Sequence, residues 1–219
     1  MCRATAYLGP PIAISALLHE PDNGLARQFS PLQHKLLNLA GFGMMAWVDN
    51  SLEAHEPLVY RETTIPIYDS NLASLSRKIS ASTVLAHVRG IPYAPSVGYG
   101  PQNLHPFRYR GTRLALAHNG ELTDFQRMRV ALHGYLHHEI AAQLSGTTDS
   151  EYVYALMLSQ LEDPSQKQSP EQILEALQKA MRIIRKERAA IGVDTRSSLN
   201  LFICDEDLLI AVRFTYDYG

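Results

Sequence analysis

Cys2, which directly follows the initiator methionine, carries the side chain of this sequence best suited to nucleophilic chemistry. Removal of Met1 would leave a thiol and a free α-amine on one residue. An N-terminal amine has an ordinary pKa near ~7.7–8, so a useful fraction is neutral at pH 7 and can accept the thiol proton. We therefore predict that Cys2 is a nucleophile with its own amine as general base. The structural alternative is a small apolar residue that enters the first strand.

Three short polar motifs have the chemistry that such a nucleophile needs. AHVRG (86–90) ends an apolar run with Arg89, LALAHNGEL (114–122) leads into Asn119-Gly120, and GTTDSE (146–151) places Asp149 in a first helical turn. Attack on an amide carbonyl creates an oxyanion, which the Asn119 amide and the Gly120 backbone N–H can bind. Arg89 offers a bidentate fork for a substrate carboxylate, and Asp149 offers a carboxylate for an ammonium group.

Each of these motifs also has an ordinary structural explanation. An arginine at a strand end is commonly a surface charge, and Asn-Gly is a frequent hairpin turn. Asp149 in a first helical turn is favourable for the helix dipole without any ligand. No single motif is specific, so the prediction depends on the set.

Composition and charge restrict the classes of partner. The 219 residues are 46% hydrophobic and 19% charged with a net charge of -2, which is an ordinary globular composition with a sizeable core. No block of like charges is present, which argues against nucleic acid or an anionic membrane surface as the main partner. No apolar stretch approaches the ~18 residues of a transmembrane helix, and PPIAISALL is too short and is interrupted by prolines.

The two cysteines, Cys2 and Cys204, are too few for a disulfide framework and indicate a reducing compartment. We therefore expect a cytoplasmic protein. Cys204 lies in the strand-like run LNLFICD, so its expected role is core packing.

The expected strands come early and late in the chain, with helices grouped between them. This order favours antiparallel sheets covered by helices over a parallel sheet. Capping boxes at 148–151 and 169–172 predict two helix starts, the second with proline at the first helical position. The expected strands are Ala4–Leu8, Gly43–Val48, Thr83–Val88, Arg113–His118, Leu199–Cys204 and Leu208–Phe214, and further helices are expected over Ser70–Ser80 and near Arg127–Leu132.

The sequence resembles the class II glutamine amidotransferases, which are N-terminal-nucleophile hydrolases. The matching segments are MCR, HVRG, NLHPF (103–107), LAHNGELTDF and GTTDSEYVYALMLS, in the family's order across residues 1–161. The MCR, NLHPF and GTTDSE segments look most like the small stand-alone γ-glutamyl amidohydrolases of ergothioneine and glutathione metabolism.

The resemblance implies both a fold and a set of roles. The fold would be a four-layer αββα sandwich of two antiparallel sheets, an α+β class. Cys2 would be the nucleophile, Asn119 and Gly120 the oxyanion hole, and Arg89 with Asp149 the site for the glutamyl head. The expected activity is hydrolysis of a γ-glutamyl amide through a thioester on Cys2, with a small γ-glutamyl substrate.

Three departures from the family pattern keep alternatives open. Ala40 stands where the family often has an acid, and the loop Gly90–Gly100 is long. The chain stops at FTYDYG just after a strand, so we expect one domain over 1–219 that is either truncated at the C-terminus or short of strands. The alternatives are a glutaminase subunit that delivers ammonia to a separate synthase partner, and an inactive binding module.

No metal or other cofactor is expected. His133, His137, His138 and Glu139 lie close together in the sequence, but their order is not the HExxH arrangement of a zinc site. The expected role of this segment is a solvated helical face.

Overall fold

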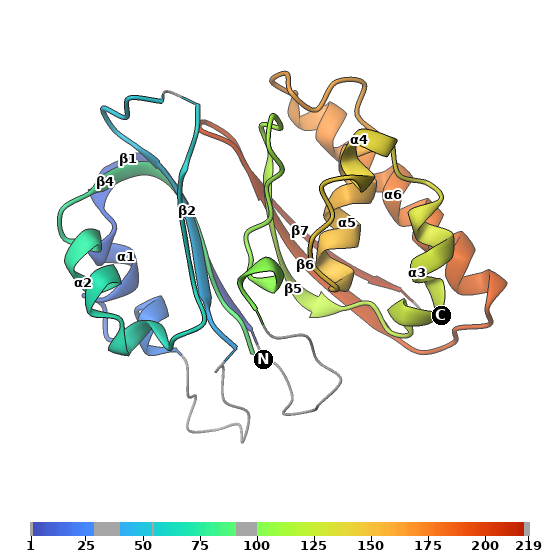
Figure 1. The fold of residues 1–219 in the computed structure, drawn as a ribbon, viewed down its shortest axis with the longest axis horizontal. Helices are drawn as coiled ribbons and strands as arrows, with labels where there is room; N and C mark the ends of the chain where they lie inside the picture. Colours follow the sequence, from blue (N-terminus) through green and yellow to red (C-terminus); the bar gives the residue numbers. More distant parts are fainter. Residues whose placement is uncertain (1, 29–39, 54, 91–99, 217–219) are drawn as a thin grey trace.

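The computed structural model describes residues 2–28, 40–53, 55–90 and 100–216, which form two antiparallel sheets (Figure 1). The first sheet has four strands in the order β1-β4-β2-β3, and the second has three in the order β5-β6-β7. The strands are β1 (Arg3–Ala13), β2 (Phe42–Val48), β3 (Leu58–Glu62), β4 (Ser80–Val88), β5 (Ala115–Glu121), β6 (Ser197–Cys204) and β7 (Leu209–Tyr216).

The helices cover the outer faces of the two sheets (Figure 1). Two short helices lie on the first sheet, and three longer helices and one short helix lie on the second. The helices are α1 (Ser15–Leu18), α2 (Ser70–Ser76), α3 (Phe125–His133), α4 (His138–Ala141), α5 (Asp149–Leu158) and α6 (Pro170–Ala190). The molecule is therefore a four-layer αββα sandwich, which confirms the predicted fold class.

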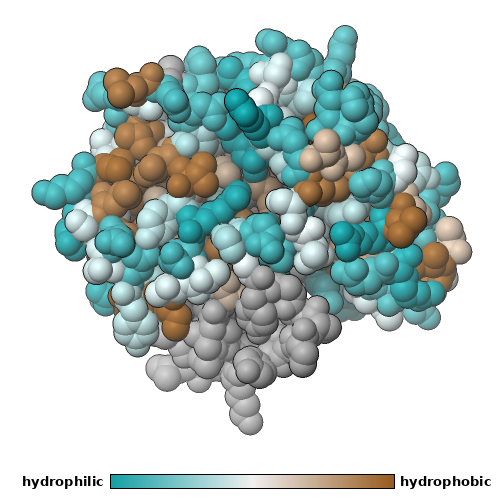
Figure 2. Space-filling model, in the orientation of Figure 1, coloured by the Kyte–Doolittle hydropathy of each residue, from teal (hydrophilic) through white to brown (hydrophobic). Residues whose placement is uncertain are grey.

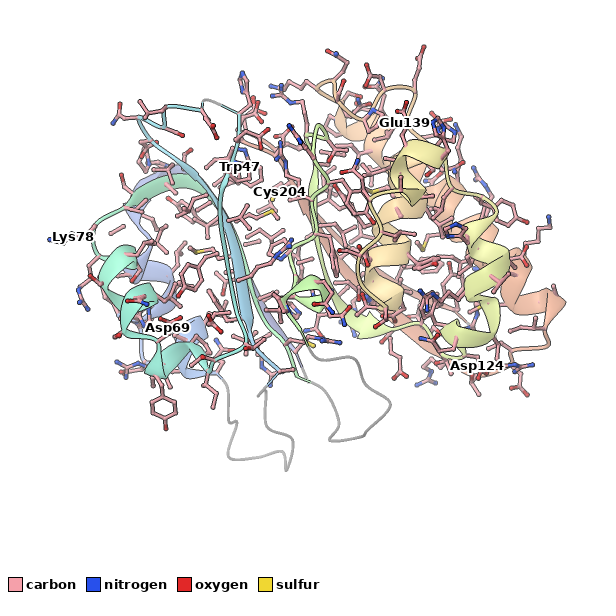
Figure 3. All side chains as sticks on the ribbon, viewed as in Figure 1. Trp47, Asp69, Lys78, Asp124, Glu139 and Cys204 are labelled. Carbon is pink, nitrogen blue, oxygen red and sulfur yellow. The ribbon has the colours of Figure 1, made fainter. Side chains whose placement is uncertain are left out.

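Alternation along the strands divides the core into three layers. In β2, Phe42 and Met44 pack toward α1 and α2, whereas Met45 and Trp47 pack toward the second sheet. Trp47 and Cys204 both lie between the sheets (Figure 3), so Cys204 is a buried core residue as expected. The third layer fills the space between the second sheet and its helices.

The two predicted helix caps differ in detail. At α6, the Ser169 side chain accepts from Gln172 N–H and the Gln172 side chain accepts from Ser169 N–H, which confirms the capping box. At α5, Thr148 accepts from Glu151 N–H, but the Glu151 carboxylate accepts from Ser145 and Gly146 instead. Glu151 thus fastens the loop that leads into α5.

Several element boundaries differ from the sequence-based prediction. The helix predicted over Ser70–Ser80 ends at Ser76, because Ser80 already begins β4. Strand β3 was not predicted. Strand β1 continues to Ala13 through Pro10 and Pro11, which an edge strand tolerates, and its pairing with β4 shifts register between Leu8 and Ile12.

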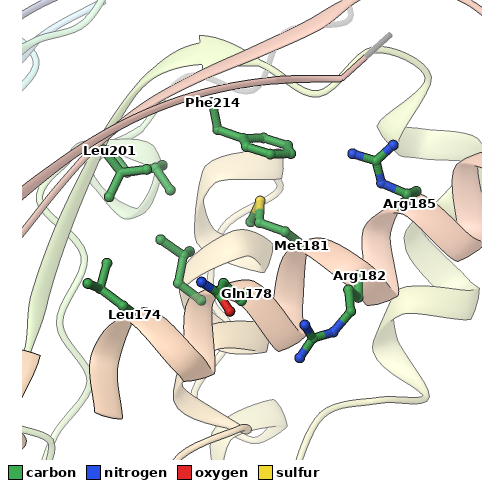
Figure 4. Close-up of a pocket in the computed structure, with 9 residues that line it drawn as sticks. Leu174, Gln178, Met181, Arg182, Arg185, Leu201 and Phe214 are labelled. Atoms are coloured by element: carbon green, nitrogen blue, oxygen red, sulfur yellow. The ribbon is translucent and has the colours of Figure 1, made fainter. Parts of the chain in front are cut away.

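The surface has a hollow beside helix α6. Apolar side chains on the face shown in Figure 2 form small groups among polar ones. A hollow of about 380 Å³ lies between α6 and strands β6 and β7, with Leu174, Met181 and Phe214 in its lining and Arg182 and Arg185 beside them (Figure 4). Within the described ranges, no helix combines the length and apolarity that crossing a membrane requires.

Candidate active site

The predicted site residues come from one end of the sandwich, where several elements begin or end. In the antiparallel pairing of β1 with β4, Arg3 lies opposite Val88, so Cys2 lies beside the residues that follow β4. Strand β5 contributes Asn119 and Gly120, and helix α5 contributes Asp149 at its first position. Long-range strand pairing therefore brings together segments that are far apart in the sequence.

Cys2 is half-buried, and its sulfur contacts the main chain of Gly90. Gly90 N–H donates to Sγ at 3.3 Å, and the thiol donates to Gly90 O at 3.4 Å. Burial raises the pKa of the Cys2 thiol, while the Gly90 N–H and the Arg89 charge oppose this rise and the Asp149 charge adds to it. A thiol whose pKa is raised needs a base to remove its proton before it can act as a nucleophile.

Asn119 lies next to Cys2. Its side-chain Nδ2 donates to the main-chain oxygen of Cys2 at 3.0 Å, which uses one of its two N–H groups. Asn119 and Gly120 are inside β5, paired with Asn200 and Leu199, so the hairpin-turn explanation is wrong. A side chain at Gly120 does not fit, because its Cβ would lie 1.9 Å from Ser198 O.

Arg89 follows the last residue of β4 and is only 6% exposed, so the surface-charge explanation is wrong. Its main chain is fixed on both sides: Arg89 N–H donates to Gly41 O at 2.9 Å, and Ala40 N–H donates to Arg89 O at 3.1 Å. Ala40 thus holds the main chain of Arg89 through its own backbone N–H. A buried guanidinium is a strong candidate for binding a carboxylate.

Asp149 links strand β5 to helix α5. Its Oδ2 accepts from Leu122 N–H at 2.7 Å, and its Oδ1 accepts from Ser150 N–H at 2.8 Å. The carboxylate is half-buried and retains unused acceptor positions. Because Asp149 is also the first residue of α5, the helix-dipole role is compatible with the structure.

The site also contains residues that the sequence did not single out. Asn200, a polar residue in the apolar run SSLNLFIC, donates from Nδ2 to Asn119 O at 2.7 Å and so fixes the backbone of Asn119. Gly90 supplies the main-chain contacts to the sulfur. His118 precedes the Asn-Gly motif, and its Nδ1 lies 2.8 Å from Ser150 Oγ. Only a known strand pairing identifies these residues.

Two histidines are buried beneath the site, between the sheets. The rings of His87 and His105 lie 4.3 Å apart between centroids, and both residues are at least nine-tenths buried. The main chain at His105 approaches Gly43 so closely that a Cβ on Gly43 would lie 2.0 Å from His105 O. Glycine at position 43 therefore permits the NLHPF segment to pack against β2.

We expect the protein to lose stability as the pH falls below about 6.5. Burial lowers the pKa of His87 to about 3 and also lowers the pKa values of His105 and His118. The unfolded chain takes up protons near pH 6.5 and the folded chain does not, so the free energy of unfolding decreases from there toward the folded pKa values. For His87 alone the loss reaches ~2 kcal/mol by pH 5.

Urea unfolding at several pH values, followed by circular dichroism, measures this loss. His138 is exposed, so His138→Gln is a control that should leave the pH dependence unchanged. An unfolding midpoint that stays constant between neutral pH and about pH 5 would contradict the prediction.

Some predicted features lie outside the described residues or form no cluster. Residues 91–99 of the Gly90–Gly100 loop and Met1 lie outside them. In the part of the chain that the structure describes, no three His, Cys, Asp or Glu side chains form a group that could hold a metal ion. His133 Nδ1 lies 3.5 Å from the Tyr152 hydroxyl, and His138 points into solvent.

Comparisons with known proteins agree with this architecture. A family model described as class-II glutamine amidotransferases matches residues 37–213, a range that leaves Cys2 outside the match. The probable glutamine amidotransferase DUG3 of Saccharomyces cerevisiae is 31% identical over 169 residues, which cover 74% of this chain and 46% of that protein. The chain thus spans about half the length of this curated relative.

A solved structure shares the fold. The glutamine aminotransferase class-II domain protein from Silicibacter pomeroyi matches with a TM-score of 0.68 at 22% sequence identity, covering 100% of this chain and 79% of that one. The extent of the family match, together with the relative from yeast, identifies this chain as a member of the class-II glutamine amidotransferase family.

Proposed function

We propose that the protein is an amidohydrolase that cleaves the γ-glutamyl amide bond of a small molecule and releases glutamate. The observation that carries this proposal is that the thiol and two opposite charges, Arg89 and Asp149, come from segments that meet at one end of the sandwich. Cys2 Sγ bonds the main chain of Gly90, which follows Arg89, and Cys2 O accepts from Asn119 on β5. The Asp149 carboxylate accepts from Leu122, which directly follows β5. A glutamyl head carries a carboxylate and an ammonium group on one carbon. A site that binds both groups needs a cation and an anion close to each other and to the nucleophile.

The reaction proceeds through a thioester. The α-amine of Cys2, freed by removal of Met1, takes the thiol proton while Sγ bonds to the γ-carbonyl carbon. The second N–H of the Asn119 amide and the Gly120 backbone stabilise the oxyanion. The C–N bond then breaks and the amine leaves with the proton. Water attacks the thioester carbonyl, glutamate departs, and the sulfur regains a proton.

A glutaminase subunit is the second candidate function. The yeast relative is a probable glutamine amidotransferase, which favours glutamine as the donor. In this function, a separate synthase would accept the ammonia. A panel of substrates separates the two functions. Turnover of glutamine alone, stimulated by a second protein, would support the glutaminase, whereas turnover of larger γ-glutamyl amides would support the amidohydrolase.

We further propose that residues 1–219 act as one cytoplasmic domain on a small γ-glutamyl substrate, without a cofactor and without nucleic acid. The side-chain layer between the two sheets supports the single domain. The two free cysteines support a reducing compartment. An inactive binding module of the same fold is excluded only by measured turnover.

Wild-type protein should release glutamate from γ-glutamyl amides that carry a free α-ammonium, and much more weakly from their N-acetylated analogues. Asp149→Asn should raise KM for the free substrates about ten-fold and change the N-acetylated ones little, since a charge-assisted hydrogen bond contributes roughly 1.5–3 kcal/mol. A coupled glutamate assay gives both constants.

Glu171→Gln is the matched control, because Glu171 is also an acidic residue in a first helical turn, at the start of α6. It should leave KM unchanged. If N-acetylated and free substrates bind wild-type protein equally well, Asp149 does not bind the ammonium group and only its helix-dipole role remains.

A further inference from the structure

Strand β5 presents neighbouring polar side chains to opposite faces of its sheet. Asn119 points into the space between the sheets and reaches the main chain of Cys2. His118 points to the other face, where its Nδ1 lies 2.8 Å from Ser150 Oγ on helix α5. His118 is 1% exposed and Ser150 is 5% exposed, so their contact is shielded from water.

The contact continues from Ser150 to Asp149. Ser150 Oγ donates to Asp149 Oδ1 at 3.2 Å, beside the Ser150 N–H that donates to the same oxygen at 2.8 Å. The Ser150 hydroxyl has one hydrogen, so when it donates to the carboxylate it accepts from His118 in the tautomer that carries the proton on Nδ1. The Ser150 hydroxyl is thereby fixed between a strand and a carboxylate. Nε2 of His118 is buried and has no hydrogen-bond partner among the described residues.

We propose that His118 and Ser150 are positioning residues that hold the Asp149 carboxylate in the orientation needed to bind the α-ammonium of a glutamyl substrate. This inference rests on the proposed function, because it takes Asp149 as the ammonium-binding group. Without the hydroxyl, Oδ1 and Oδ2 keep one main-chain donor each, from Ser150 and Leu122, and the carboxylate loses the side-chain donor that links it to His118 on β5. Small misplacements of a binding group reduce affinity strongly.

If the contact between His118 and Ser150 serves only to stabilise the fold, the expected results differ. If the His118–Ser150 bond only fastens α5 to β5, its loss lowers stability and affects all ligands alike. A positioning role instead affects ligands that carry an α-ammonium and spares those that lack one. L-glutamate and glutarate form a suitable pair, since glutarate has both carboxylates and no ammonium.

Isothermal titration of the whole chain with L-glutamate and with glutarate tests the proposal. Ser150→Ala should weaken L-glutamate about five- to ten-fold and change glutarate less than about two-fold, the expected size for one hydrogen bond. Ser159→Ala is the matched control, because Ser159 is also a buried serine, at the C-terminal end of α5, whose hydroxyl bonds Ala155 O. It should change neither affinity.

A second pair of variants addresses the histidine. His118→Asn keeps a polar group near the Nδ1 position and should retain most of the preference for L-glutamate, whereas His118→Phe fills the same space and should lose it. Thermal melts verify that each variant is folded, and alanine at position 150 suits a first helical turn.

The outcomes separate this inference from the proposed function. If wild-type protein prefers L-glutamate over glutarate and Ser150→Ala keeps the same preference, the positioning role is wrong and the proposed function stands. If wild-type protein shows no preference, Asp149 does not bind the ammonium group, and both are overturned. Equal weakening of both ligands by Ser150→Ala would assign the bond to stability alone.

Discussion

Cys2→Ala is expected to reduce kcat by at least about 10⁴-fold, because removal of a nucleophile leaves only the binding and oxyanion contributions. The thermal midpoint should change little, since the half-buried thiol bonds the main chain of Gly90 and belongs to none of the three core clusters of the described residues. Glutamate release and circular dichroism melts of purified protein provide the two readouts. An active Cys2→Ala protein would remove the thioester from the mechanism.

For Cys204→Ala we expect the opposite result, a lower thermal midpoint with an unchanged kcat. Cys204 is buried between the sheets, and burial raises the pKa of its thiol far above the ordinary range, so it is unreactive. Its replacement should lower the thermal midpoint and preserve kcat.

The proposed mechanism also predicts that active protein lacks Met1, which intact-mass measurement of the wild type can test. Full activity in protein that retains Met1 would contradict the use of the Cys2 amine as base.

Asn119→Ala should lower kcat about 10²–10³-fold and change KM much less, which is the usual loss for one oxyanion donor. The reason is the position of its amide, 3.0 Å from the main-chain oxygen of Cys2 with one N–H still available. Steady-state kinetics on a γ-glutamyl amide separates the two constants.

Asn200→Ala is the comparison for this prediction. The Asn200 side chain bonds the backbone oxygen of Asn119 and not its amide, so its loss should cost far less in kcat than the loss of Asn119 itself. A near-normal kcat for Asn119→Ala would mean that Asn119 is not an oxyanion donor and has only a structural role within β5.

The sequence predicted those parts of the fold that depend on local pattern. Short apolar runs identified β2, β4 and β6, and the Ser169 capping box located the start of α6, because these signals lie within one element. Strand β3 was missed because LVYRE is a short edge strand in which no residue is fully buried. The end of α2 was placed too late because Ile79 packs in the same core layer from outside the helix.

The site could be predicted only in part, for a related reason. Residue types identified Cys2, Arg89 and Asp149 as candidates, but their arrangement depends on which strands pair and in which register. The contacts of Asn200 with Asn119 and of His118 with Ser150 join residues 81 and 32 positions apart. No periodicity within a segment reports such pairs. The steric need for glycine at position 120 likewise becomes visible only beside Ser198 on β6.

The alternation of His118 and Asn119 along β5 has a consequence for insertions and deletions. Side chains change faces with every residue of a strand, so a shift of β5 by one position would exchange the two. The imidazole would then face the thiol and the amide would face helix α5, which would replace an oxyanion donor with a cysteine–histidine pair. A deletion of one residue at the start of β5 would thus change which side chain faces the thiol, although His118 and Asn119 would both remain in the sequence.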